Sequence, residues 1–147
     1  MAVKEITPQQ AHDTLSADPT AVYIDVRTPR EFENGHPVGA VNVPVAFPDP
    51  ARGMVLNPDF VSVVERNFSK DKKIIVGCQA GPRSTAAARM LEQTGYQDVS
   101  NMLGGFGGMR DQMGNTVAPG WAASGLPVSQ ENGEGINYAS LKLKIKN

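Results

Sequence analysis

The 147-residue chain carries 14 basic and 15 acidic side chains, and 40% of its residues are hydrophobic. This length suits one α/β domain, and the balanced charge gives no bias toward nucleic acid or an anionic membrane. The first residues hold no apolar run, and no apolar stretch approaches the roughly 20 residues that cross a bilayer, so we expect no signal peptide and no membrane contact. Cys78 has no second cysteine to pair with, which favours a reducing compartment. We therefore expect a cytoplasmic protein.

Strands and helices are expected to alternate along the chain. Apolar and β-branched runs predict strands at Glu5–Ile6, Ala21–Val26, Val41–Val43, Ile74–Val76 and Val99–Asn101. Amphipathic spacing and good helix formers predict helices at Pro8–Ser16, Arg30–Glu33, Asn57–Phe68 and Thr85–Thr94. Ser84 and Thr85 are the expected N-caps of the last helix. This order predicts an α/β fold with a mostly parallel central sheet and helices on both faces.

The strand at residues 21–26 leads into a polar pair, Asp25 and Arg27, and Gly35 ends the short helix that follows. His36 lies between that glycine and the next strand. This place is typical of a turn residue and argues against His36 as the base for a cysteine. Two histidines, one cysteine and no carboxylate cluster at ligand spacing give no metal site to propose.

Cys78 follows the run Lys73–Gly77, which is typical of a strand buried on both faces of a parallel sheet. A tight loop and a helix come directly after it. Ligands of open α/β sheets bind at the carboxyl ends of the strands, and a helix N-terminus with a nearby arginine favours the thiolate form of a cysteine. The position therefore predicts a nucleophile for an anionic substrate. The alternative is a small buried side chain without chemistry.

The loop after Cys78 offers backbone N–H groups and the charge of Arg83 to an anion. Four residues separate Cys78 from Arg83, one fewer than in a cysteine-dependent phosphatase loop. A compact sulfur on the cysteine fits this cradle better than a tetrahedral phosphate, which disfavours a phosphatase or an arsenate reductase. The predicted substrate-binding residues are Gln79, Ala80, Gly81, Pro82, Arg83 and Ser84.

Three segments resemble the signatures of the rhodanese-like sulfurtransferase family. The loop matches the family pattern of active-site residues at Cys78, Gly81, Arg83 and Ser84. Residues 23–44 resemble the amino-terminal signature, with Asp-Val-Arg, then Glu-Phe, then a Gly-His segment that ends in Gly-Ala. Residues 99–110 resemble the carboxy-terminal signature, with its pair of glycines. The resemblance covers about residues 3–128.

The chain departs from the family pattern at several positions. Gln79 stands where many thiosulfate-using members carry arginine or lysine, and Pro82 has no N–H to donate, so the anion cradle is weakened. Met109 occupies the place of a family tryptophan, and we expect Trp121 to fill the same space from further along the chain. Residues 110–120 would then form an inserted excursion beside the active site.

The resemblance implies a rhodanese-like three-layer fold and a double displacement in which Cys78 becomes a persulfide. It implies that Asp25 and Arg27 brace the catalytic loop through hydrogen bonds and an ion pair with Glu31; the alternative is that Arg27 and Glu31 only hold the fold together. The expected partners are a thiosulfate-like sulfur donor and, as acceptor, cyanide, a small thiol or a protein cysteine. No cofactor is implied, and the chain is expected to be a monomer or a homodimer.

Two functions from other classes use the same cradle. One is a non-catalytic binding or regulatory module, and the other is a carrier that passes sulfur only between proteins. A Cys78 that loads poorly from small donors would favour either of these over an enzyme that uses small molecules.

The chain is expected to divide into residues 1–128, which form the rhodanese-like domain, and residues 129–147, which form a C-terminal extension. The extension begins with a turn-rich piece and ends in Ser140–Lys146, where apolar residues and lysines alternate. This alternation predicts a strand, either at the edge of the chain's own sheet or added to the sheet of a partner.

Overall fold

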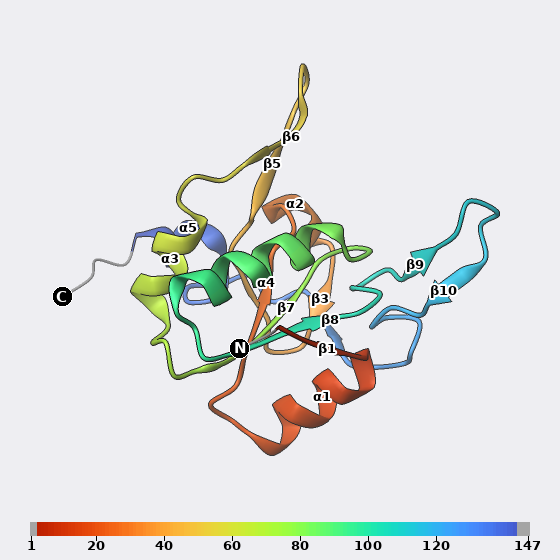
Figure 1. The fold of residues 1–147 in the computed structure, drawn as a ribbon, viewed down its shortest axis with the longest axis horizontal. Coiled ribbons are helices and arrows are strands. Elements are labelled where there is room, and N and C mark those ends of the chain that lie inside the picture. The colour runs from red at the N-terminus through yellow and green to blue at the C-terminus, as the bar shows by residue number, and fades with distance from the viewer. Residues whose placement is uncertain (1–2, 144–147) are drawn as a thin grey trace.

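A five-stranded sheet lies at the centre of the molecule, as the computed structural model of residues 3–143 shows (Figure 1). Its strands pair in the order β1-β8-β7-β2-β4, and all four pairings are parallel. The strands are β1 (Lys4–Ile6), β8 (Asp98–Met102), β7 (Lys73–Gly77), β2 (Val22–Asp25) and β4 (Val41–Asn42). The predicted α/β fold with a mostly parallel sheet is confirmed.

Helices cover both faces of the sheet because successive side chains of a strand point to opposite sides. Tyr23 of β2 and Ile75 of β7 pack with α1 (Pro8–Ala17) and α2 (Pro29–Glu33) on one face. Ile24 and Val76 pack on the other face. That face is covered by α3 (Phe60–Asn67), α4 (Pro82–Thr94) and α5 (Tyr138–Lys142). The molecule therefore has three layers.

The start of α4 differs from the expectation. Ser84 and Thr85 lie inside the first turns of the helix, whose N-cap is Gly81 and whose first residue is Pro82. Proline suits this first position because its fixed φ matches the helix and its missing N–H would have had no helical partner. The hydroxyls of Ser84 and Thr85 instead donate back to the Gly81 carbonyl, at 2.9 and 3.1 Å.

Two antiparallel hairpins extend from the layered body in Figure 1. The first joins β5 (Ala46–Asp49) to β6 (Gly53–Leu56), and the sequence patterns did not predict it. The second joins β9 (Met109–Arg110) to β10 (Thr116–Ala118) and, apart from Met109, lies within the expected excursion of residues 110–120. A further short pairing joins β3 (His36–Pro37) to β11 (Val128–Ser129).

The predicted strand at Ser140–Lys146 is wrong for residues 140–143, and residues 144–146 lie outside the described part of the chain. Asn137 caps α5 by accepting a hydrogen bond from the Ser140 N–H at 2.8 Å. Tyr138 and Leu141, three positions apart, then share one helical face and join the core beside α3. The burial of these two side chains favours the helix over the alternating pattern.

The Tyr138 hydroxyl also accepts a hydrogen bond from the Asn57 side chain at 3.0 Å. These contacts attach the C-terminal segment to the main body, whereas a domain boundary at residue 128 stays a prediction.

Among the helices of residues 3–143, none combines the length and the apolar character that a membrane crossing requires.

Candidate active site

Cys78 directly follows β7, at the carboxyl end of the central sheet, and lies just before α4. Its side chain is buried. The sulfur accepts a hydrogen bond from the Gly81 N–H at 3.0 Å, and the thiol donates toward the Ser84 hydroxyl oxygen at 3.4 Å. The loop thus curls around the sulfur and directs a backbone donor at it, an arrangement that stabilises negative charge on the thiolate.

Gly81 gives the loop its shape. Its φ of 139° lies in a region that favours glycine, and a Cβ at this position would lie 3.2 Å from the terminal methyl carbon of Met109. Its carbonyl accepts hydrogen bonds from the backbone N–H of Thr85 as well as from the hydroxyls of Ser84 and Thr85. The Gly81 N–H is therefore held in place before any substrate arrives.

The glycine-rich segment after β8 packs directly on the backbone of the loop. The Phe106 N–H donates to the Cys78 carbonyl at 2.7 Å, and the Gly107 N–H donates to the Gln79 carbonyl at 2.8 Å. A Cβ on Gly105 would lie 2.3 Å from the Cys78 carbonyl oxygen. In the sequence, this pair of glycines resembles part of a family signature, which did not predict that the segment packs on the Cys78 loop.

Asp25 and Arg27 form a buried pair beneath the loop, with an Arg27 Nη2 to Asp25 Oδ2 distance of 2.8 Å. Arg27 also donates to the Gln79 side-chain oxygen at 3.0 Å and to the Gly35 carbonyl at 2.6 Å. Its guanidinium lies 4.6 Å from the centre of the Phe106 ring. Arg27 thereby connects the end of β2 to the Cys78 loop through Gln79.

The ion pair with Glu31 is made by Arg83, whereas Arg27 pairs with Asp25. Arg83 binds the Glu31 carboxylate through both terminal nitrogens, at 2.8 and 3.1 Å. Burial alone would raise the pKa of Glu31, but the hydrogen bonds from Arg83 and Thr28 and the Arg83 charge outweigh it and lower this pKa to about 2. The Glu31 hydrogen bond in turn raises the pKa of Arg83. The Arg83 charge is therefore largely balanced within the protein.

The remaining predicted loop residues contribute backbone. Within residues 3–143, the Ala80 N–H has no recorded hydrogen-bond partner, which leaves it available to a bound oxyanion. Pro82 supplies the first helical residue and no donor. The predicted anion cradle consequently depends more on the N–H groups of Ala80 and Gly81 than on the Arg83 guanidinium, which is paired with Glu31.

Two cavities adjoin the loop. The smaller, of about 230 Å³, is lined by Arg27, Glu31, Asn34, Gly35, Gln79 and Phe106. The larger, of about 370 Å³, is lined by Thr28, Glu31, Pro48, Met54 and Arg83. Pro48 and Met54 belong to the β5–β6 hairpin and were not singled out in the sequence. In the sequence, these two residues differ from their surroundings only in being apolar and in flanking the Asp-Pro-Ala-Arg-Gly turn.

His36 has a scaffold position rather than a place beside the sulfur. Its ring stacks on that of Phe32 with centroids 3.7 Å apart, and its Nδ1 lies 2.8 Å from the Phe32 carbonyl oxygen. Across residues 3–143, no three side chains from His, Cys, Asp and Glu gather in a way that could hold a metal ion.

Comparison with known proteins gives consistent matches. Residues 7–112 match the model of the family described as "Rhodanese-like domain". The chain is 42% identical over 117 residues to Thiosulfate sulfurtransferase 16, chloroplastic, of Arabidopsis thaliana, an alignment that covers 80% of this chain and 85% of that protein. It is 34% identical over 128 residues to Thiosulfate sulfurtransferase GlpE of Haemophilus influenzae (strain PittEE), covering 87% of this chain and 96% of that protein. The crystal structure of Rv0390 from M. tuberculosis superposes with a TM-score of 0.74 at 33% identity, covering 89% of this chain and 100% of that one.

Proposed function

Because the chain belongs to the rhodanese-like domain family, we propose that it is a sulfurtransferase in which Cys78 carries the transferred sulfur as a persulfide. The observation that carries this proposal is the Gly81 N–H, which points at the Cys78 sulfur from 3.0 Å. The names of the relatives from Arabidopsis thaliana and Haemophilus influenzae add thiosulfate as a donor to consider.

In the first half-reaction, the Cys78 thiolate attacks the outer sulfur of a thiosulfate-like donor. A new S–S bond forms at Cys78 while the S–S bond of the donor breaks, and sulfite leaves with the electron pair. In this proposal the Gly81 N–H, which already donates to the Cys78 sulfur, and the Ala80 N–H stabilise negative charge on the donor and on the persulfide.

In the second half-reaction, cyanide or an acceptor thiolate attacks the terminal sulfur of the persulfide. The S–S bond at Cys78 breaks, and the electron pair returns to Cys78 as a thiolate. The acceptor leaves as thiocyanate or as a new persulfide. No proton or electron is needed from a cofactor, and a reducing cytoplasm would keep Cys78 ready for the next cycle.

The surroundings of the loop weaken binding of a small dianion. Arg83 is paired with Glu31, and Arg27 is paired with Asp25. Loss of one hydrogen bond to a charged group costs about 1.5–3 kcal/mol, so thiosulfate should bind weakly here. The same observation favours a second candidate function, a carrier that receives sulfur from a protein partner whose own surface stabilises the leaving group.

Intact-protein mass spectrometry tests the proposal. Incubation with thiosulfate should add the mass of one sulfur atom, and cyanide should remove it. Cys78→Ser should gain nothing. As a matched control, Cys78→Ser combined with Met113→Cys places the only thiol on the exposed tip of the β9–β10 hairpin, where Met113 is 85% exposed. That thiol should not load.

Two results would contradict the proposed sulfurtransferase function. No gain of sulfur from thiosulfate or from mercaptopyruvate would overturn the small-molecule donor and leave the protein-fed carrier or a binding module. Equal loading of the Met113→Cys control would show that the loop contributes nothing to the chemistry.

A further inference from the structure

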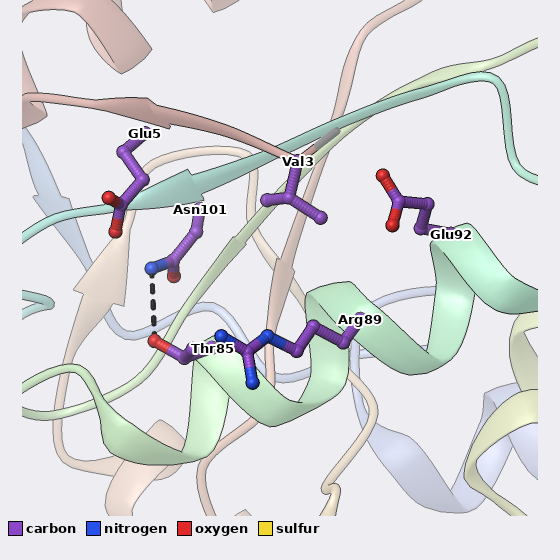
Figure 2. A pocket seen from close by; sticks show the side chains of 6 residues that line it. All are labelled: Val3, Glu5, Thr85, Arg89, Glu92 and Asn101. Atoms are coloured by element: carbon purple, nitrogen blue, oxygen red, sulfur yellow. Dashed lines mark hydrogen bonds between the residues drawn. The ribbon is translucent and has the colours of Figure 1, made fainter. Parts of the chain in front are cut away.

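A third cavity lies between the edge strand β1 and one face of α4 (Figure 2). Its volume is about 320 Å³, within the range of about 300–1,000 Å³ that is typical of small-molecule sites. It shares no lining residue with the two cavities beside Cys78. Its lining residues are Val3, Glu5, Thr85, Arg89, Glu92 and Asn101.

Asn101 supplies the first sign of a ligand. Its side chain is 3% exposed, and within residues 3–143 its Oδ1 has no hydrogen-bond partner. The Thr85 hydroxyl donates to the Gly81 carbonyl at 3.1 Å and therefore accepts from Asn101 Nδ2 at 3.2 Å. The unpartnered atom is thus the acceptor of the amide. A buried acceptor without a donor costs about 1–3 kcal/mol, so a group that donates to it would be favoured.

The charged side chains that line the cavity are the second observation that indicates a ligand. Thr85, Arg89 and Glu92 lie on one face of α4 at helical spacing, and Figure 2 shows their side chains beside those from the strands. Glu5 is the register neighbour of Asn101, so both point from the sheet toward α4. Within residues 3–143, no ion pair or hydrogen bond is recorded for the side chains of Glu5, Arg89 or Glu92.

We propose that this cavity binds an α-amino acid with a basic side chain. Its ammonium group would bind Glu5 and donate to Asn101 Oδ1, while its carboxylate would bind Arg89. Its basic side chain would reach Glu92, which lies one helical turn beyond Arg89. Three ligand charges would then meet three opposite protein charges, and the proposal stands whether or not Cys78 transfers sulfur.

The cavity is connected to the catalytic loop. Asn101 binds Thr85, Thr85 binds the Gly81 carbonyl, and Gly81 directs its N–H at the Cys78 sulfur. A ligand that fixes Asn101 should therefore change the chemical shift of the Gly81 amide as well as those of the cavity residues.

Titration of the ¹⁵N-labelled protein with L-lysine, followed by NMR, tests the proposal. We expect saturable shifts of the Asn101 side-chain amide and of the Thr85 and Gly81 backbone amides at millimolar ligand. Two matched ligands separate the charges, because norleucine is lysine without the side-chain ammonium and cadaverine is lysine without the carboxylate. Each should bind about threefold to fivefold more weakly than lysine, as for one exposed ion pair.

Two variants assign each charge to its partner. Arg89→Gln should remove the preference for lysine over cadaverine, and Glu92→Gln should remove the preference for lysine over norleucine. Both changes are at the surface of α4, so the fold should persist. Arg52→Gln, an exposed change in the β5–β6 turn, should leave all affinities unchanged.

The absence of saturable shifts with lysine would overturn the proposal. Unchanged ligand preferences in Arg89→Gln and Glu92→Gln would also overturn it, since binding would then occur elsewhere. Because the titration measures binding without turnover, these outcomes are independent of the sulfur-loading result for Cys78.

Discussion

Two arginines at the Cys78 loop lie in different environments. Arg27 and Asp25 are 3% and 1% exposed, whereas Arg83 and Glu31 are 23% and 34% exposed. A buried charge whose partner is removed is strongly destabilising, while a pair that keeps contact with water contributes much less to stability. The buried pair therefore acts as part of the framework beneath the loop, and the partly buried pair of Arg83 and Glu31 sets the charge available at the opening of the loop.

Arg27→Met tests the buried side of this comparison and should have the largest effect. The change keeps much of the side-chain volume but leaves the Asp25 carboxylate buried without its partner, which should lower the free energy of unfolding by about 3–5 kcal/mol. Urea denaturation measures this, with Arg110→Met on the exposed β9–β10 hairpin as the control. A loss below about 1 kcal/mol would mean that the pair is not part of the framework.

Gln79→Arg tests whether the cavity beside the Cys78 loop lacks a positive charge that is available to a substrate. Gln79 lines the cavity beside the loop and accepts from Arg27. An arginine there could bind a thiosulfate-like donor directly, so KM for thiosulfate should fall about tenfold, as expected for one charge-assisted hydrogen bond. Gln79→Met loses the same bond to Arg27 without gaining charge. Equal KM values for the two variants in a cyanide-coupled assay would contradict the prediction.

Arg83→Gln tests the partly buried pair with Glu31 and should change stability little. Since Glu31 keeps contact with water, the free energy of unfolding should fall by at most about 1 kcal/mol. The effect should shrink further at high salt. Chemical denaturation at low and high ionic strength measures both. A loss comparable to that of Arg27→Met would remove the distinction between the two pairs.

Acid titration gives the smallest expected effect. The pKa of Glu31 in the folded protein, about 2, lies below its ordinary value of 4.5. The unfolded chain therefore binds this proton first as the pH falls, and the stabilisation from Glu31 is present above about pH 4.5 and lost between about pH 4.5 and pH 2. Thermal unfolding across this range should show a shallower pH dependence in Glu31→Gln than in the unchanged protein. Parallel curves would exclude this role for the Glu31 pKa.

Much of the fold follows from local patterns. The run Lys73–Gly77 has the residues of a fully buried parallel strand, and α1 has both a polar cap at Thr7 and a proline at its first position. Such features act over a few residues, so they predict a strand or a helix without knowledge of the element that packs against it. The prediction for residues 140–143 of the C-terminal segment was wrong because it considered only the alternation at residues 140–146. Tyr138 lies just before that run and three positions from Leu141, and the Asn137 cap and the packing beside α3 favour the helix.

For the site, the sequence by itself determined the loop around Cys78 and its position at a strand end, and it predicted Cys78 as the nucleophile, because each depends on neighbouring residues and on the general geometry of parallel sheets. Only the tertiary structure decided that Arg83 pairs with Glu31, 52 positions away, and that Asn101 leaves an acceptor open beside α4. Charge pairing and hydrogen-bond satisfaction depend on which side chains meet across the fold. Composition and spacing fix the available groups, whereas packing selects their partners.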